Sequence, residues 1–120
     1  MKESKISVLL VKPGKCPKII EIHDTLKAMQ CIVGGDIEVY RPFDDDVAIV
    51  CNEEGKIKGF PLNRAIYSDR GELIDIIAGA FFVCYAPVDS EKFLSLHKEL
   101  AEKYEEYFKE PKSFNTKTVI

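Results

Sequence analysis

The sequence lacks an excess of positive charge, which excludes one broad class of function. Its 120 residues carry 17 lysines and arginines against 20 aspartates and glutamates, for a formal net charge of -3. Proteins that bind duplex DNA by electrostatic attraction need a basic face, so nucleic acid is not an expected partner. The charge is also well short of the acidity expected of a protein that mimics DNA.

Close cysteine pairs are missing as well. The four cysteines are Cys16, Cys31, Cys51 and Cys84, whereas zinc sites usually draw their ligands from tight pairs. Three of them, Cys31, Cys51 and Cys84, stand in apolar runs, where a free cysteine serves as a small buried hydrophobe. The even count leaves disulfides open as an alternative, but this placement predicts reduced cysteines in a cytoplasmic protein.

Long apolar runs and phosphate-binding loops are also absent. The apolar run at residues 6–11 is too short for a signal-peptide core or a membrane span. Gly34 and Gly35 precede a predicted strand, whereas glycine-rich phosphate loops precede a helix. We therefore expect no membrane contact and no cofactor.

What the sequence does contain is enough for one globular domain. Its hydrophobic share of 46% and charged share of 31% are typical of soluble globular proteins. A chain of this length buries roughly two thirds of the surface that it exposes when unfolded. We assign residues 1–110 to a single domain and residues 111–120 to a C-terminal tail that begins at the helix-ending Pro111.

Turn residues and alternation predict the elements of the first half. Residues 6–11 and 18–23 are expected to form a hairpin around the turn PGKCP. Asp24 is the expected cap of a short helix, which Gly34 and Gly35 end because glycine tolerates a left-handed C-terminal position. DIEVYR alternates as a strand with one wet face, and VAIVC follows as a buried strand.

Two short motifs predict further hairpins. NEEG matches a type I turn closed by a glycine bulge, so Asn52, Glu53 and Gly55 are interpreted as structural turn residues that lead into a strand KIKGF. The Asn52 side chain is expected to cap the backbone of its own turn. SDRG, which contains Gly71, predicts a second turn of this kind and thus a hairpin between AIY and ELIDIIAG. AFFVCY is a predicted central strand.

A long helix is predicted near the C-terminus. Asp89 is its expected N-cap, with Val88 and Phe93 as a hydrophobic staple. An apolar stripe at helical spacing, with His97 as a core histidine, then covers the sheet or serves in part as a homodimer interface. Together the elements predict an α+β fold: a mostly antiparallel sheet of five to six strands with hairpins, one short helix after the second strand, and the long C-terminal helix packed on the sheet.

The direction of the strands predicts one polar end of the molecule. VAIVC begins at Asp44–Asp46 and ends at Asn52–Glu54, roughly 17–20 Å away, so these two acidic clusters cannot form one site. KIKGF is expected to run back and to return Asn63 and Arg64 to the aspartate end, where Arg41 also arrives.

The predicted ligand-binding residues are those of this end. Arg64 offers a planar fork for a carboxylate or a phosphate, and Asn63 is its orienting neighbour, with Arg41 and Asp45 at the rim. In the alternative interpretation, Arg64 pairs with a local aspartate and Asn63 caps a loop.

The three consecutive aspartates carry two interpretations. Asp44, Asp45 and Asp46 offer the oxygen ligands that a divalent cation prefers, but no known calcium-loop spacing surrounds them and adjacent side chains diverge. A solvated acidic turn is the simpler interpretation, so no metal site is predicted, and the cation is kept as the weaker alternative at Asp44 and Asp46.

Four blocks of sequence carry a resemblance to a known family. They are IVGGDIEV, PFDDDVAIVCNEEGK, PLNRAIY and DIIAGAFFV. In these blocks the chain resembles the DUF3846 family, an uncharacterised domain of Firmicutes mobile-element and phage proteins. The resemblance implies a small intracellular protein of a mobile element and supplies no catalytic assignment. The polar positions that it maps onto this chain are Asn52, Glu53, Gly55, Asn63, Arg64, Asp75 and Gly79.

The predicted function is therefore a small cytoplasmic binding or regulatory module of a mobile element or phage-derived region, without enzymatic activity. It is expected to bind a protein or a small anionic ligand near Arg64. A small metal-dependent hydrolase or phosphodiesterase that uses Asp44–Asp46 is one alternative. An anti-restriction or anti-defence protein is another.

Overall fold

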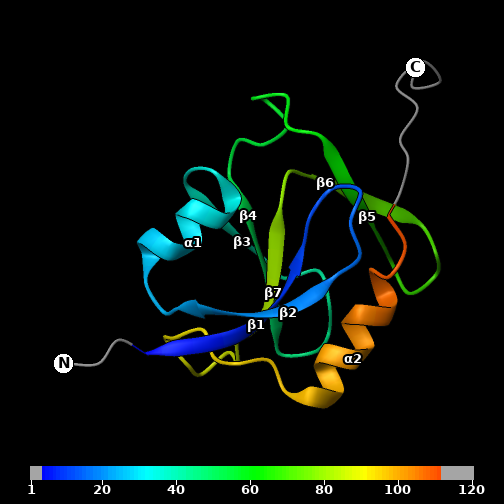
Figure 1. The fold of residues 1–120 in the computed structure, drawn as a ribbon. Coiled ribbons are helices and arrows are strands. Elements are labelled where there is room, and N and C mark those ends of the chain that lie inside the picture. The colour runs from blue at the N-terminus through cyan, green and yellow to red at the C-terminus, as the bar shows by residue number, and fades with distance from the viewer. Residues whose placement is uncertain (1–3, 112–120) are drawn as a thin grey trace.

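The computed structural model describes residues 4–111, which form two antiparallel sheets and two helices (Figure 1). The elements in chain order are β1 (Lys5–Val11), β2 (Lys18–His23), α1 (Leu26–Val33), β3 (Ile37–Tyr40), β4 (Val47–Asn52), β5 (Leu62–Tyr67), β6 (Leu73–Ala78), β7 (Phe81–Tyr85) and α2 (Lys98–Tyr107). The larger sheet has the order β2-β1-β7-β4-β3, and β5 pairs with β6 as a separate two-stranded ribbon. The predicted α+β class with mostly antiparallel strands is confirmed.

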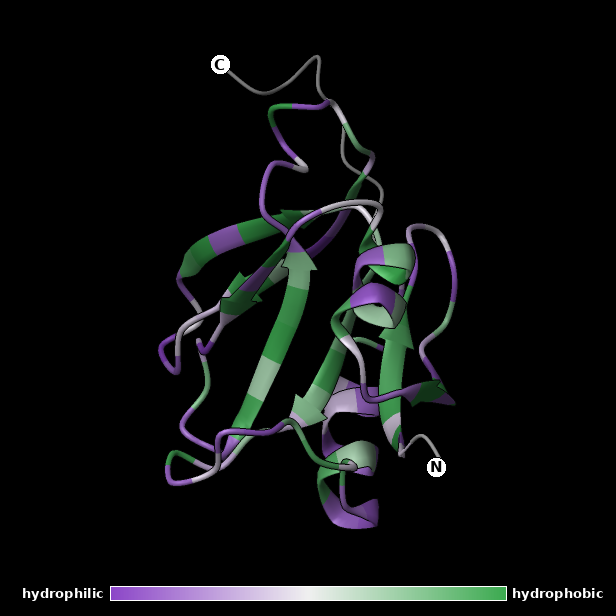
Figure 2. Cartoon of the chain, turned by 90° about the vertical axis from the view of Figure 1, so that its left-hand side faces the viewer, coloured by the Kyte–Doolittle hydropathy of each residue, from purple (hydrophilic) through white to green (hydrophobic). Residues whose placement is uncertain are grey.

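The five-stranded sheet lies between two unlike layers. On one face, Val8, Val50 and Phe82 pack in a core cluster with Met29 of α1. On the opposite face, β1, β4 and β7 pack against α2 and the β5–β6 ribbon, which contribute Tyr104, Ile66 and other apolar side chains. In Figure 2 the central strands are hydrophobic along most of their length, whereas both helices carry a hydrophilic side. Each face of the five-stranded sheet therefore carries one of the two hydrophobic cores.

The predicted hairpin after β4 is wrong. Residues 53–59 form a series of turns in place of the strand KIKGF, and β4 pairs with β3 and β7 instead. The physical reason is that KIKGF has too little apolar surface to hold a sheet position, since the side chain of Ile57 is 84% exposed. Gly59, at a φ of 76°, and Pro61 then redirect the chain. The described residues therefore contain seven strands in two sheets, not five to six in one.

The C-terminal helix is shorter than predicted and begins at Lys98, with His97 rather than Asp89 as its N-cap. Leu94 forms an antiparallel bridge with Tyr85, and the Leu96 amide donates to the Ser7 carbonyl at 2.9 Å. Phe93 and Leu96 pack into cores on opposite faces of the sheet, a placement that one helical stripe cannot provide. His97, predicted to be a core residue, is exposed.

The short helix α1 is confirmed, but its cap lies one residue later than predicted. The hydroxyl of Thr25 accepts a hydrogen bond from the Ala28 amide at 3.1 Å, and Gly34 ends the helix at a φ of 81°. All four cysteines are free; Cys51 and Cys84 are buried, whereas Cys31, predicted to be buried, is exposed.

The hairpins β1–β2 and β5–β6 form as predicted. Ser7 of β1 pairs with Glu21 of β2, and Ala65 of β5 pairs with Ile76 of β6. The tail proposed for residues 111–120 lies, after Pro111, outside the described residues. Within residues 4–111, no helix has the length and apolar character needed to cross a bilayer.

Candidate functional site

Arg64, the predicted anion-binding residue, is buried with 2% of its surface exposed. Its Nε donates to the Phe108 carbonyl at 3.0 Å and its Nη2 to the Lys15 carbonyl at 2.6 Å. Its Nη1 donates to the carbonyl and side-chain oxygens of Asn63 at 3.3 and 2.8 Å. Burial lowers the pKa of the guanidinium. The Arg64 guanidinium thus donates to oxygens of the protein itself. The prediction that it is accessible to an anion is therefore wrong.

Asn63 has an equally complete structural role. Its Nδ2 donates to the carbonyls of Val11 and Gly79, at 3.0 and 2.9 Å, while its Oδ1 receives Arg64. The pair therefore ties the β5–β6 ribbon to β1, to the β6–β7 turn, to the β1–β2 turn and to the end of α2. Neither the ligand interpretation nor the loop-cap alternative anticipated this network, because its acceptors are backbone carbonyls distant in sequence.

Arg41 and Asp45 do lie at one end of the sheet, but each has its own partner. Nη1 of Arg41 donates to the Ala86 carbonyl at 2.7 Å. One carboxylate oxygen of Asp45 accepts from Lys103 Nζ at 2.6 Å and from the Tyr104 hydroxyl at 2.7 Å. The Lys103 hydrogen bond, followed by that of Tyr104, lowers the pKa of Asp45. Arg64 is hydrogen-bonded elsewhere, so the predicted shared rim of guanidinium and aspartates does not form.

The predicted acidic turn does not gather its carboxylates around one point. Asp44 and Asp46 are exposed, and Asp45 is occupied by α2. Among residues 4–111 there is no group of three histidine, cysteine, aspartate or glutamate side chains that could hold a metal ion. The hydrolase alternative at Asp44–Asp46 therefore lacks the converging ligands that it requires in this part of the chain.

Of the residues assigned to turns, Glu53, Gly55 and Gly71 lie in turns and Asn52 is the last residue of β4, for reasons that partly differ from those predicted. Oδ1 of Asn52 accepts from the Glu54 amide at 2.7 Å, which is the expected cap, and its Nδ2 reaches the Val33 carbonyl at 3.0 Å. Gly71 adopts a φ of 80° in the β5–β6 turn. Gly55 is needed for close packing instead, since a Cβ there would lie 2.7 Å from the Ala78 carbonyl oxygen. The side chain of Glu53 is exposed.

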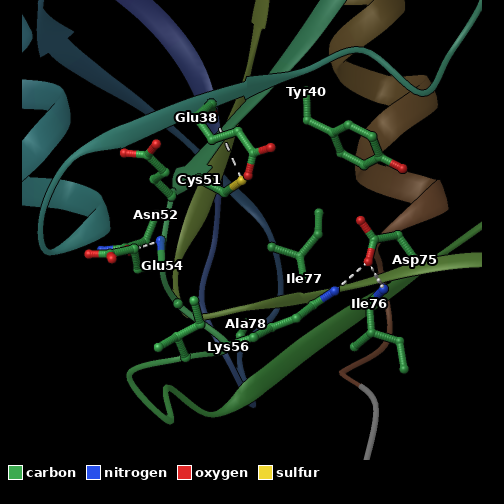
Figure 3. Close-up of a pocket in the computed structure, with 13 residues that line it drawn as sticks. Glu38, Tyr40, Cys51, Asn52, Glu54, Lys56, Asp75, Ile76, Ile77 and Ala78 are labelled. Carbon is green, nitrogen blue, oxygen red and sulfur yellow. Dashed lines mark hydrogen bonds and ion pairs between the residues drawn. The ribbon is translucent and has the colours of Figure 1, made fainter.

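A cleft opens where the edge of the larger sheet faces the β5–β6 ribbon. Its volume is about 330 Å³, and we call it the carboxylate cleft. β3 supplies Glu38 and Tyr40 to one wall, and β6 supplies Asp75 to the other (Figure 3). The complete lining is Glu38, Tyr40, Cys51–Ile57 and Asp75–Ala78. The site thus draws on segments that are distant in sequence.

Strand geometry explains why these side chains meet. Successive residues of a strand point to opposite faces, so Glu38 and Tyr40 leave β3 on the same side. On β6, Oδ1 of Asp75 accepts from the Ile76 amide at 2.7 Å, which holds the carboxylate at the strand edge. The same oxygen accepts from Lys56 Nζ at 2.6 Å. Asp75 is therefore positioned from its own strand and from the turns that follow β4.

The cleft is strongly acidic over an apolar floor. Four carboxylates line it, from Glu38, Glu53, Glu54 and Asp75, together with the single lysine Lys56. Lys56 forms an ion pair with Asp75 at 2.6 Å and Lys58 forms one with Glu54 at 3.9 Å, which leaves Glu38 and Glu53 without an ion pair within residues 4–111. The floor includes Ile77 and Ala78, both buried. A cationic group that enters this space meets the Glu38 carboxylate on the β3 wall and, on the β6 wall, an Asp75 carboxylate that already binds Lys56.

The protonation of two groups in the cleft reflects this negative field. Burial, followed by the charges of Glu38 and Asp75, raises the pKa of the Cys51 thiol to about 12. Burial, with Asp75 as the next cause, also raises the pKa of the Tyr40 hydroxyl. Cys51 is therefore a thiol at neutral pH, and its Sγ points to the Glu38 carbonyl at 3.8 Å. Since the thiolate is the nucleophilic form, Cys51 is not set up for nucleophilic catalysis.

Comparison with known proteins identifies the family of the chain. The model of the domain of unknown function DUF3846 matches residues 5–109. The chain belongs to this family. No curated protein and no solved structure matches it.

The resemblance stated from the sequence is confirmed as to family, whereas the mobile-element setting stays a prediction. Of the polar positions that the resemblance mapped, Asn52, Asn63 and Arg64 are buried in this DUF3846 domain. Four of the mapped positions, Asn52, Glu53, Gly55 and Asp75, line the carboxylate cleft. Of its two mapped carboxylates, Glu53 is exposed, and Asp75 is held in place by Lys56 and the Ile76 amide.

Sequence reasoning missed Glu38, Tyr40 and Asp75 as parts of one site. The sequence does indicate part of this site on β3, because alternation puts Glu38 and Tyr40 together on its solvent-facing side. No local signal brings β6 opposite β3, since the ribbon is separated from that strand by β4 and a run of turns. The site therefore depended on tertiary placement.

Proposed function

We propose that this DUF3846 domain is a non-enzymatic binding module that receives a cationic segment of a protein partner in the carboxylate cleft. The observation that carries the proposal is the lining itself: four carboxylates and one lysine around an apolar floor, with Glu38 and Glu53 free of ion pairs within residues 4–111. This replaces the predicted anionic ligand near Arg64, whose donors are directed at protein oxygens.

A binding role fits the chemistry of the cleft better than catalysis. The raised pKa values of the Cys51 thiol and the Tyr40 hydroxyl keep both groups protonated, so neither supplies an anionic nucleophile at neutral pH. The carboxylates remain to pair with lysine or arginine side chains, and the apolar floor supports the aliphatic part of such a side chain.

NMR titration with deca-lysine, against deca-glutamate, tests the proposal. We expect deca-lysine to shift the amide signals of residues that line the carboxylate cleft and deca-glutamate to leave them in place. Glu38→Gln is expected to weaken binding by about fivefold, the effect of losing one partly exposed ion pair. Glu21→Gln, on exposed β2 at the far edge of the sheet, is the matched control and should bind like the wild type.

The result that contradicts the proposal is equally clear. If deca-lysine shifts signals over the whole surface, or if Glu38→Gln binds as tightly as Glu21→Gln, the carboxylate cleft is not the binding site.

A further inference from the structure

A second hollow lies beside the carboxylate cleft, where the β3–β4 turn faces the tip of the β5–β6 ribbon and α2. We call it the aromatic hollow; its volume is about 370 Å³ and its lining is Pro42, Phe43, Asp44, Asp45, Tyr67, Ser68, Asp69, Ile74, Lys103, Tyr104 and Tyr107. It thus combines aromatic rings with carboxylates, whereas the floor of the cleft is mainly aliphatic.

The two hollows share both of their walls. On one wall, Glu38 and Tyr40 belong to the cleft, and the residues that follow from Pro42 belong to the aromatic hollow. On the other wall, Asp75 belongs to the cleft and the preceding Ile74 to the aromatic hollow. The linings of the two spaces are thus neighbours in the sequence on both sides, and we call the two spaces together the track.

Packed aromatic rings form one side of the aromatic hollow. The ring centroids of Phe43 and Tyr104 are 4.8 Å apart, and those of Phe43 and Tyr107 are 5.2 Å apart. Asp44 and Asp69 add negative charge and form no ion pair within residues 4–111. Flat rings beside carboxylates suit an arginine or lysine side chain, which stacks on the ring face while its charge meets the acid.

The aromatic hollow already holds one cation of the chain itself. Lys103 places its Nζ 2.6 Å from an Asp45 oxygen and 5.5 Å from the centre of the Tyr104 ring. In this contact an ammonium group lies beside both a carboxylate and an aromatic ring; the Tyr104 ring is itself buried, and the exposed rings of the lining are Tyr67 and Tyr107. Lys103 neutralises Asp45, so the remaining negative charge lies at Asp44 and Asp69.

The rim of the track favours an extended protein segment over a small cation. Leu73 and Ile74 of β6 are 55% and 49% exposed, and Tyr67 of β5 is 40% exposed. Each of the sheets ends here, with β3 pairing only with β4 and β6 only with β5 among the described residues. Edge strands leave backbone groups for pairing with another chain, and the exposed side chains offer apolar contact to its residues.

From this geometry we infer that the track binds two basic side chains of one partner segment, one in the carboxylate cleft and one in the aromatic hollow. The inference rests on the proposed function and adds the spacing of the recognised residues. Along β3 and its turn, the centres of the two linings are about four residues apart, which is at most about 13 Å of extended chain. In an extended segment, residues four positions apart point to the same side, so the partner's basic residues are expected four positions apart in its sequence.

Isothermal titration with two short serine–glycine peptides tests this. One peptide carries two arginines about four positions apart and the other carries only the first arginine. We expect the two-arginine peptide to bind about tenfold more tightly. The double variant Tyr67→Leu, Asp69→Asn should remove that gain and leave the one-arginine peptide unaffected. Glu72→Gln, in the same turn but outside both linings, is the matched control and should retain the gain.

The outcomes separate the inference from the proposed function. If both peptides bind alike and Glu38→Gln weakens both, the second subsite is absent and the proposed function stands. If Glu38→Gln changes neither affinity, or if neither peptide binds, both are overturned. Spermidine supplies ammonium groups without a peptide backbone; if it binds as tightly as the two-arginine peptide, the assignment to a protein segment is overturned.

Discussion

At the scale of single residues, the most consequential feature is a buried arginine that has no carboxylate partner within residues 4–111. The Arg64 guanidinium is hydrogen-bonded to carbonyls of Lys15, Asn63 and Phe108, and to the Asn63 side chain. A hydrogen bond from a charged donor stabilises a fold more than a neutral one does, and a buried acceptor left without its donor costs free energy. Arg64 thus joins three segments that are distant in sequence.

Arg64→Ala is expected to lower the free energy of unfolding by about 3 kcal/mol, because three carbonyl groups lose a charged donor in the interior. Urea unfolding followed by circular dichroism measures this. Arg70→Ala, at an exposed turn position, is the matched control and should change the free energy by less than about 0.5 kcal/mol. Equal stability of the two variants would show that the Arg64 network is dispensable.

At the scale of secondary-structure elements, caps and turns decide where each element begins and ends. The helix α1 begins after Thr25, whose hydroxyl accepts the Ala28 amide, although Asp24 is an equally suitable residue type. The backbone settles the choice between them, because the Asp24 amide pairs with the Ser4 carbonyl at 2.8 Å beside the sheet. Asp24 therefore still belongs to the strand region, and Thr25 takes the cap position.

Thr25→Ala is expected to destabilise the protein by about 1 kcal/mol, because it removes the hydrogen-bond acceptor at the N-terminus of α1. Asp24→Ala is the comparison, since it removes the residue that the sequence alone suggests as the cap. Chemical unfolding of both variants gives the answer: a larger loss for Asp24→Ala than for Thr25→Ala would reverse the assignment of the cap.

At the scale of the whole molecule, α2 and the β5–β6 ribbon together cover the sheet face that holds the larger core. α2 contributes Ala101 and Tyr104, the ribbon contributes Ile66 and Ile77, and Phe108 follows α2 in the same cluster. The apolar stripe of the C-terminal segment is thus used largely within the chain. A homodimer through α2 stays a prediction, for which the partly exposed Tyr107 is the available apolar contact.

Truncation after Pro87 is expected to abolish cooperative folding, because it exposes the sheet face under α2 and removes the Phe108 carbonyl from Arg64. The dispersion of amide signals in an NMR spectrum measures the loss. A chain ending at Pro111 retains every contact described above and is the control. A truncated chain that stays folded would place α2 outside the essential core, and loss of a dimer at the same time would support an interface there.

The sequence by itself determined the local elements of this protein. The turn in SDRG, the alternation of DIEVY and the glycine stop after α1 each predict a structure that forms, because hydrogen bonding and side-chain direction within a few residues decide them. It also determined the family, through motifs that the match over residues 5–109 confirms. The strand predicted at KIKGF failed because its two large apolar residues, Ile57 and Phe60, do not alternate on one face, and Ile57 stays 84% exposed.

Only the tertiary structure decided which elements face each other. The β5–β6 ribbon packs across the sheet instead of extending it, and this buries Arg64 while bringing Asp75 opposite Glu38 and Tyr40. Such contacts join residues far apart in sequence, and their free energy comes from burying two apolar surfaces together. The residue pattern of a strand shows which of its faces is apolar and will be buried. Which other element packs against that face depends on the fold of the whole chain.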